Sequence, residues 1–486
     1  MKKKHIWRSL LLSSAILFAY PSNQPAEAAS VENISGTVKW QEPQGLWIDP
    51  TGNLLVVDTT NHTIHSITEQ LTKASVIGQN SGLDAYGLPL GGYIDANANT
   101  AMFNNPTDIV VDSKGIIYIS DAANHTIRKV VNGAVYTHAG TGEAGYQNGT
   151  KTQAQFNYPA GLALDANDHL YVADSLNHVI RKVTPDGFVT TVAGTAVENG
   201  GYKNGSAFTA QFNEPSDVEF GADGQLFVSD SGNQVIRQVV DGQVTTYAGV
   251  AANLDAESGY YEGGYQNGLK DTARFNFPKS LDYADGYLFV ADSLNNRVRA
   301  ITPNGSVVNL AGQSEAGKTL GDIGQAQFDA PSAVQYSNGT LFVTDTGNKQ
   351  LKSFPVDLTN VVAVQSDDDV MNSTPLLPAS ATPQIWLNGK QVAFNEKIAP
   401  IKVDGKTYIP VHAFFKEWGA TVKQLTYKKS ITVVKDQTVL SLTIDEQNIL
   451  LKDGRSYIEA GYLQTLKPFT IVEVQDYNAV IIQSAN

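Results

Sequence analysis

The sequence predicts an all-β six-bladed propeller followed by a small α+β domain. The propeller is predicted because one short stretch recurs along most of the chain, for example as IYISDAANHTIRKV at residues 117–130 and LYVADSLNHVIRKV at 170–183. The second domain is predicted because residues 384–486 combine several hairpin patterns with a single helical pattern.

Each copy of the repeat is centred on an aspartate, and successive copies lie 53–63 residues apart: Asp58, Asp121, Asp174, Asp230, Asp292 and Asp345. Four short runs of β-branched and aromatic residues, bounded by Gly, Asn, Asp and Pro, predict four antiparallel strands per copy. A four-stranded sheet cannot bury both of its faces alone. Six such sheets therefore predict a closed propeller.

The Asp-x-x-Asn turn of each copy is interpreted as structural, because Asp and Asn side chains bond nearby backbone N–H groups and tolerate left-handed conformations. The sixth copy lacks a fourth strand after Phe354. We expect the N-terminal stretch 34–38 to supply it and close the ring, with 361–364 as the competing candidate.

Strand alternation places the Asp-x-x-Asn turns at the same end as the long connections between blades. These connections present a tyrosine beside Asn-Gly, at Tyr146, Tyr202 and Tyr265, with Tyr93 as a looser fourth copy. Aromatic rings with polar tips on long loops suit a sugar or an extended peptide. The alternative, favoured by the faithful repetition, is that each tyrosine pins its own loop.

Histidines follow the turn asparagine in three consecutive copies, at His62, His125 and His178. Equivalent positions in adjacent blades are usually too far apart to share one metal ion. We therefore treat His125 and His178 as candidate ligand-binding residues of the loop-rich face and do not expect a metal there.

A column of cations occupies the third strand of four copies: Arg128, Arg181, Arg237 and Arg299. The expectation for these arginines is exposure, with pairing to surface carboxylates.

The residue two positions after each blade's first proline should lie nearest the axis. This column contains Asp108 and Asp217, two blades apart, among small residues. An asymmetric carboxylate pair at the channel mouth makes these two the candidate residues for a cation such as Ca²⁺, which prefers oxygen ligands.

The repeats also carry a family resemblance. The Phe-Asn-x-Pro segments and the Gly-x-Val-x-Thr-x-Ala-Gly endings at 187–194 and 242–249 resemble NHL repeats over about residues 35–357. The resemblance implies an NHL-type propeller acting mainly as a binding platform. Related six-bladed folds include lactonases, which hold a central Ca²⁺, and an amidating lyase.

The C-terminal part follows a linker at 358–383 and reads as hairpins with one short helix around Phe414–Trp418, ended by Gly419. Leu387-Asn388-Gly389, Asp404–Thr407 and Tyr408–Val411 resemble the copper amine oxidase N-terminal-like domain. That domain's name refers to an activity located elsewhere in the oxidases. His412 is the only histidine here, so we expect neither copper nor amine oxidation.

The chain begins with a basic, apolar and then small-residue pattern over residues 1–28, which predicts a signal peptide before a propeller at 29–357. No other segment is long and apolar enough to span a membrane. The net charge is −14 and cysteine is absent, which argues against nucleic-acid binding and favours export from a Gram-positive bacterium.

These observations predict a secreted or cell-surface protein that is not an enzyme. Its loop-rich propeller face would bind a protein, a peptide or a cell-wall glycan. The alternative is a hydrolase or lyase with a cation in the axial channel.

Overall fold

The computed structural model describes residues 29–358 except 50–51 and 69–72, together with Val361 and the strands and one helix of the C-terminal part between residues 384 and 484. The predicted signal peptide at 1–28 and most of the predicted linker lie outside the described residues. Within the part described, no helix has the length and apolar character needed to cross a membrane.

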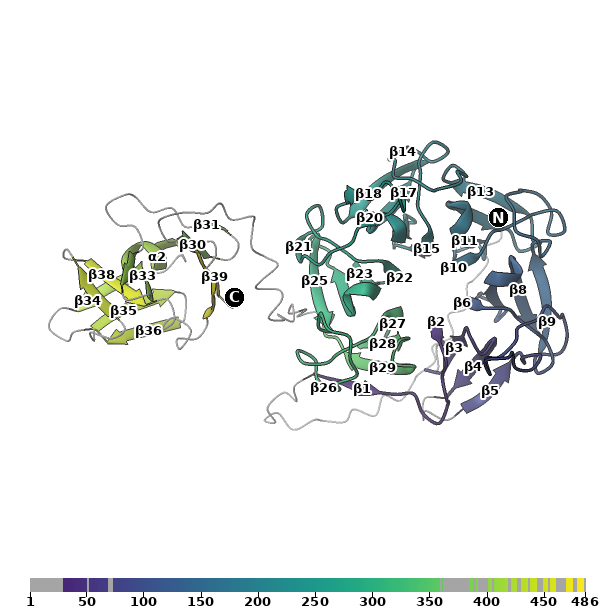
Figure 1. The fold of residues 1–486 in the computed structure, drawn as a ribbon, viewed down its shortest axis with the longest axis horizontal. Helices are drawn as coiled ribbons and strands as arrows, with labels where there is room; N and C mark the ends of the chain where they lie inside the picture. Colours follow the sequence, from purple (N-terminus) through teal and green to yellow (C-terminus); the bar gives the residue numbers. More distant parts are fainter. Residues whose placement is uncertain are drawn as a thin grey trace, which may run out of the picture.

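Six four-stranded antiparallel sheets form a closed ring, which confirms the predicted propeller (Figure 1). Blade one contains β2 Pro43–Ile48, β3 Leu54–Asp58, β4 Thr63–Ile67 and β5 Lys73–Ile77, and blade two contains β6 Pro106–Val111, β7 Ile117–Asp121, β8 Thr126–Val131 and β9 Ala134–Ala139. Blade three contains β10 Pro159–Leu164, β11 Leu170–Asp174, β12 Val179–Val183 and β13 Val189–Ala193, and blade four contains β15 Pro215–Phe220, β16 Leu226–Asp230, β17 Val235–Val240 and β18 Gln243–Ala248. Blade five contains β22 Pro278–Ala284, β23 Tyr287–Asp292, β24 Arg297–Ile301 and β25 Ser306–Ala311. Each blade starts at its proline. Proline has no backbone N–H to donate to the ladder, and it is therefore tolerated at the first position of a strand.

The sixth blade is completed by the N-terminus, as expected. It contains β27 Pro331–Ser337, β28 Thr340–Asp345 and β29 Gln350–Pro355, and β1 Ser30–Asn33 pairs antiparallel with β29. The closing strand therefore precedes the predicted stretch 34–38, of which only Ile34 continues the ladder by donating its N–H to the Leu351 carbonyl at 2.8 Å. Joining the first and last strands removes the open edge that an unclosed ring would leave.

In the described part of the propeller, the buried hydrophobic residues form six clusters, one between each pair of neighbouring blades. The phenylalanine three residues before the blade's first proline is fully buried in five of these clusters, as Phe103, Phe156, Phe212, Phe275 and Phe328. Since each blade buries its faces only against its neighbours, no blade has a core of its own.

Short strands from the preceding connections extend three outer edges: β14 Gly205–Ser206 on β18, β21 Gly268–Leu269 on β25, and β26 Gly321–Asp322 on β1. A further hairpin, β19 Ala252–Leu254 with β20 Tyr261–Glu262, rises from the connection between blades four and five. These additions account for the long spacing of the repeats.

The C-terminal part contains the predicted hairpins and helix. Its strands are β30 Gln384–Leu387, β31 Lys390–Gln391, β32 Ile401–Val403, β33 Lys406–Pro410, β34 Thr421–Leu425, β35 Ser430–Lys435, β36 Thr438–Thr443, β37 Ile449–Lys452, β38 Arg455–Glu459, β39 Phe469–Val474 and β40 Ala479–Ser484, with α2 at Val411–Glu417. Phe414 and Phe415 of α2 are buried and contact each other edge to face.

Candidate functional site at the channel mouth

The repeated aspartate of each blade is buried at the loop-rich end. We call this aspartate, with the groups that donate hydrogen bonds to it, the hub of the blade. Asp174 accepts hydrogen bonds from the Asn157 N–H at 2.8 Å, from Asn177 Nδ2 at 2.9 Å and from Arg181 Nη1 at 2.6 Å. The first bond ties the turn to the chain entering the same blade. The structural interpretation of the Asp-x-x-Asn turn therefore agrees with its contacts.

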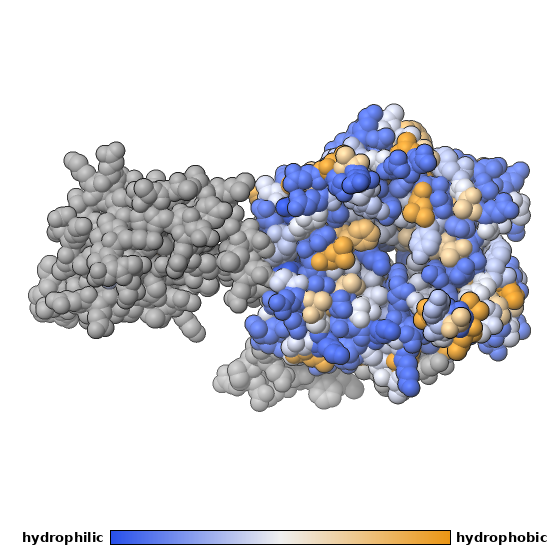
Figure 2. Space-filling model, viewed as in Figure 1, coloured by the Kyte–Doolittle hydropathy of each residue, from blue (hydrophilic) through white to orange (hydrophobic). Residues whose placement is uncertain are grey.

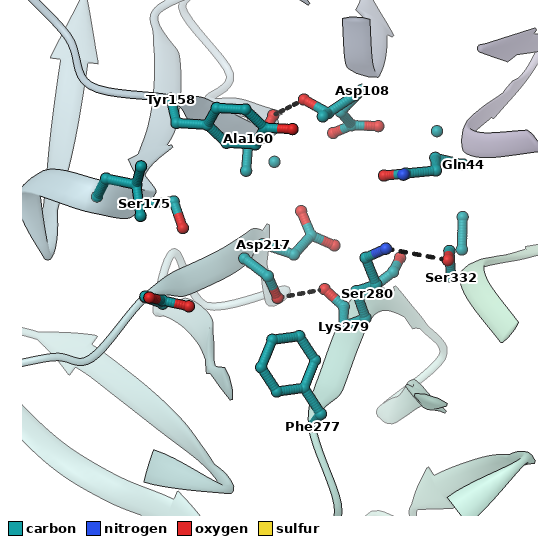
Figure 3. Close-up of a pocket in the computed structure, with 17 residues that line it drawn as sticks. Gln44, Asp108, Tyr158, Ala160, Ser175, Asp217, Phe277, Lys279, Ser280 and Ser332 are labelled. Atoms are coloured by element: carbon teal, nitrogen blue, oxygen red, sulfur yellow. Dashed lines mark hydrogen bonds between the residues drawn. The ribbon is translucent and has the colours of Figure 1, made fainter. Parts of the chain in front are cut away.

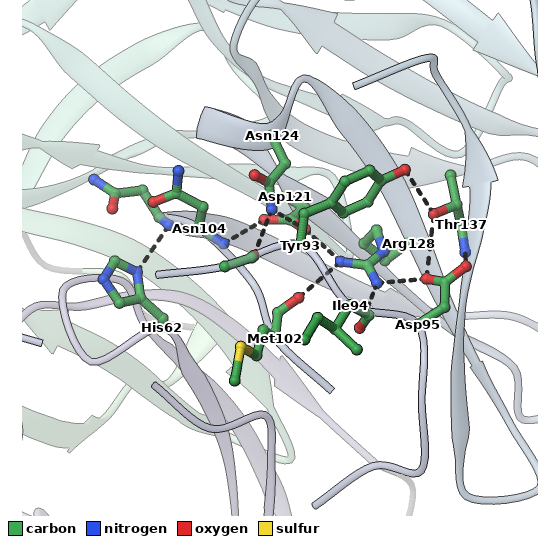
Figure 4. Close-up of polar contacts among 12 residues, drawn as sticks. His62, Tyr93, Ile94, Asp95, Met102, Asn104, Asp121, Asn124, Arg128 and Thr137 are labelled. Atoms are coloured by element: carbon green, nitrogen blue, oxygen red, sulfur yellow. Dashed lines mark hydrogen bonds and ion pairs between the residues drawn. The ribbon is translucent and has the colours of Figure 1, made fainter. Parts of the chain in front are cut away.

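The arginine column was expected to be exposed, and this expectation is wrong. Arg128, Arg181, Arg237 and Arg299 are fully buried, and each pairs with the aspartate of its own repeat at 2.6–2.9 Å. Each guanidinium also donates to carbonyls of the preceding connection, as Arg128 does to Met102 and Ile94 (Figure 4). Buried charges are tolerated when they are paired and hydrogen-bonded in this way.

The four tyrosines lie over these arginines. The rings of Tyr93, Tyr146 and Tyr202 lie 4.9–5.0 Å from the guanidinium carbons of Arg128, Arg181 and Arg237, and Tyr265 lies 4.8 Å from that of Arg299. The Tyr93 hydroxyl shares a 2.9 Å hydrogen bond with Thr137 Oγ1 (Figure 4). These contacts hold each connection against its own blade. Tyr93 and Tyr146 keep 44% of their surface exposed, so their role in ligand binding stays a prediction.

The histidines connect neighbouring blades. His125 Nδ1 accepts the Tyr158 N–H at 3.2 Å, and His178 Nδ1 accepts the Glu214 N–H at 3.0 Å. Gln234 and Asn296 use their side-chain oxygens in the same way in later blades, at Phe277 and Ala330. In the first five copies the column therefore supplies a hydrogen-bond acceptor to the next blade, from a histidine, a glutamine or an asparagine. Lys349 of the sixth copy donates instead, from Nζ to Gln41 Oε1 at 3.0 Å. Burial lowers the pKa of His178, which favours the neutral ring that can accept this hydrogen bond.

The axial channel opens as a cavity of about 380 Å³ at this end of the propeller. Figure 2 shows the centre of the ring bordered by hydrophilic residues and by a group of hydrophobic ones. All six residues of the predicted innermost column line it: Gly45, Asp108, Gly161, Asp217, Ser280 and Ala333. Tyr158, Glu214 and Phe277, which precede the prolines, also belong to its lining, so the cavity shares a face with the connections.

Asp108 and Asp217 both enter this cavity (Figure 3). Asp108 Oδ2 accepts the Leu162 N–H and Asp217 Oδ2 accepts the Leu281 N–H, each at 2.8 Å, so each carboxylate binds the backbone of the inner strand of the next blade. Glycine is needed opposite each of them, since a Cβ on Gly161 would lie 2.1 Å from Asp217 Oδ1 and one on Gly45 would lie 2.9 Å from Asp108 Oδ1. Burial raises the pKa of Asp108 to about 7, and burial together with the charge of Asp108 raises that of Asp217 well above its usual range.

Three further titratable residues at the axis were missed from the sequence. Lys279 lines the cavity and donates from Nζ to Ser332 Oγ at 3.2 Å, and burial lowers its pKa (Figure 3). Glu219 follows Asp217 by two residues in β15, and Asp282 follows Ser280 by two residues in β22. Burial raises the pKa of both carboxyl groups. The positions of Glu219 and Asp282 could have been predicted from strand alternation, because residues i and i+2 of a strand point to the same side.

No group of three or more metal-ligating side chains is found among the described residues. Asp108 and Asp217 alone provide fewer oxygen ligands than the 6–8 that Ca²⁺ usually takes. In the described part of the chain, the predicted cation site therefore consists of two carboxylates without further ligands.

Comparisons with known proteins identify both domains. Residues 91–302 match the teneurin NHL domain and residues 386–466 match the copper amine oxidase N-terminal domain. The chain is an NHL-repeat six-bladed β-propeller protein with a copper amine oxidase N-terminal domain at its C-terminal end.

Among curated proteins, NHL repeat-containing protein 2 of Gallus gallus is 26% identical over 409 residues, covering 73% of this chain and 54% of that protein. The chain spans about half or less of the length of the first curated relatives it matches. Among solved structures, a protein of unknown function from Bacteroides thetaiotaomicron has a TM-score of 0.51 at 16% identity, covering 68% of this chain and 76% of that one. An auxiliary nutrient binding protein from Bacteroides ovatus has a TM-score of 0.50 at 14% identity with the same coverage. These structures share the fold.

Proposed function

We propose that this chain is an exported, non-enzymatic binding protein whose propeller holds a peptide or glycan ligand at the cell envelope. The observation that carries the proposal is the axial cavity of about 380 Å³, which opens on the face bearing the long connections. Sites for small ligands usually occupy concave pockets of about 300–1,000 Å³ with a few convergent polar groups. The nutrient-binding description of a propeller of the same fold is consistent with this role.

Binding of cell-wall fragments and glycans on an array, measured with the full chain, tests the proposal. Ala160 lines the cavity, so Ala160→Trp should fill it and reduce binding by about tenfold or more. Leu269→Trp is a matched control, because Leu269 is 64% exposed on β21 at the outer edge. Equal binding by both variants and the unaltered chain would place the ligand elsewhere and overturn the proposal.

The second candidate is a hydrolase or lyase that uses a cation in the channel. It is favoured by Asp108 and Asp217, whose carboxylates enter one cavity beside the amine of Lys279. Calcium titration followed by thermal melting tests it. A rise in melting temperature at millimolar Ca²⁺ that Asp108→Asn with Asp217→Asn abolishes would support this candidate, and no shift would remove it.

A further inference from the structure

The axial cavity is lined by one amine and two carboxyl groups that form no ion pair with one another. Lys279, Asp108 and Asp217 all line it, and among the described residues none of the three takes part in an ion pair within 4.0 Å. Lys279 instead donates to a serine hydroxyl, and each aspartate accepts from a backbone N–H. This differs from the repeat column of buried arginines, in which Arg128, Arg181, Arg237 and Arg299 each pair with the aspartate of their own repeat.

Buried charges that lack a partner are costly, and proteins normally pair them. The inner strands hold these three side chains in place, since the strand backbone fixes where each one enters the channel. Figure 3 shows Asp108 and Asp217 on different sides of the cavity, with Lys279 and Gln44 also directed toward its interior. The cavity therefore presents one positive and two acidic groups to whatever occupies it.

We propose that the ligand of this cavity is a zwitterion, an amino acid or the end of a short unblocked peptide. Its ammonium group would lie between Asp108 and Asp217, and its carboxylate would meet Lys279. The rings of Tyr158 and Phe277, which also line the cavity, would contact the side chain of the ligand. This inference rests on the proposed binding function and narrows its ligand class.

The chemistry of the site explains why a zwitterion is favoured over a singly charged ligand. A cation alone would leave the Lys279 ammonium with only the Ser332 hydroxyl and no carboxylate partner, and an anion alone would leave the two carboxyl groups facing each other. Hydrogen bonds between charged groups contribute more than neutral ones, so a ligand that pairs both signs gains at both ends.

Isothermal titration calorimetry of the full chain with three probes tests the inference: L-alanyl-L-alanine, its N-acetyl derivative and its C-terminal amide. We expect the unblocked dipeptide to bind at least about tenfold more tightly than either blocked form. Lys279→Met should remove the preference for a free carboxylate only. Asp217→Asn, which keeps an acceptor for Leu281, should weaken the preference for a free amino group only.

Lys114→Met serves as a matched control for loss of a lysine charge, because Lys114 is 66% exposed and lies in the turn between β6 and β7. Equal affinities for the three probes, or no binding of the unblocked dipeptide, would overturn the inference. If Ala160→Trp still abolishes binding of another array ligand in that case, only the ligand class is wrong. If Ala160→Trp changes nothing for any ligand, the proposed function itself fails.

Discussion

Removing the aspartate of one hub should destabilise the whole propeller, and Asp174→Ala is the sharpest case. Asp174 and Arg181 are fully buried and 2.6 Å apart. Without the carboxylate, the arginine keeps bonds to the Gln155 and Gln147 carbonyls and to Asn148 but loses its counter-charge. The Asn157 N–H also loses its acceptor, and Asn177 Nδ2 keeps only its bond to the Gly145 carbonyl.

Breaking a buried ion pair from one side costs about 3–5 kcal/mol, because an uncompensated charge remains. At about 2.1 cal/mol/K of unfolding entropy per residue over the propeller, this corresponds to a fall in Tm of about 4–7 °C. Calorimetry and urea unfolding of the full chain measure both quantities. A change in the unfolding midpoint is interpretable as stability if the slope against urea is unaltered.

The pair Lys114–Asp168, at 3.3 Å, is the matched control, because the Lys114 side chain is 66% exposed. Lys114→Ala should cost less than about 1 kcal/mol, since surface ion pairs contribute little. If Asp174→Ala costs no more than this control, the hub does not stabilise the blade as described. If Asp174→Ala with Arg181→Met is as unstable as the sum of the single variants, the two side chains do not act as a pair.

Three further predictions follow from the contacts between blades and at the axis. The folded pKa of Asp108 is about 7 against a usual 3.8, so its protonated form is favoured by folding and the stability it contributes should fall as pH rises from about 4 to about 7. Urea unfolding at several pH values should show this loss, and Asp108→Asn should flatten the profile. His178→Ala removes the acceptor of the Glu214 N–H and should lower the free energy of unfolding in urea by about 1–3 kcal/mol. His178→Gln should lose much less stability, because Gln234 accepts the equivalent N–H in the next blade. Equal loss in both variants would argue against this hydrogen bond between blades. Val31→Asp places a charge in the core between blades five and six and should lower Tm more than Glu32→Asp, which changes a residue exposed on the same strand; equal melting would show that β1 does not close the ring.

The repeat alignment predicted the fold in detail. The number of blades, the four strands of each and the shared face of the turns and connections follow from strand patterning, which is a local property of the chain. The innermost column was also predicted correctly, because every repeat starts at a proline that sets the register. The closing strand was placed a few residues late, since four-residue strands such as β1 have little pattern to locate their ends.

The candidate site was predicted only in part. Asp108 and Asp217 were found because they interrupt a column of small residues. Lys279, Glu219 and Asp282 were not predicted, because the repeat pattern does not show which neighbouring positions closure of the ring buries at the axis. The arginines were taken for surface cations because a strand position says nothing about what the preceding connection lays over it.

The sequence by itself determined a ring of six sheets, because each copy repeats the same local hydrogen-bonding and hydrophobic pattern. Only the tertiary structure decided which side chains meet, since closure of the ring brings together residues far apart in the chain. It buried Arg181 beneath Tyr146, aimed His178 at the next blade and gathered Lys279 with two carboxyl groups around one cavity. These contacts depend on how neighbouring blades pack, which no single repeat encodes.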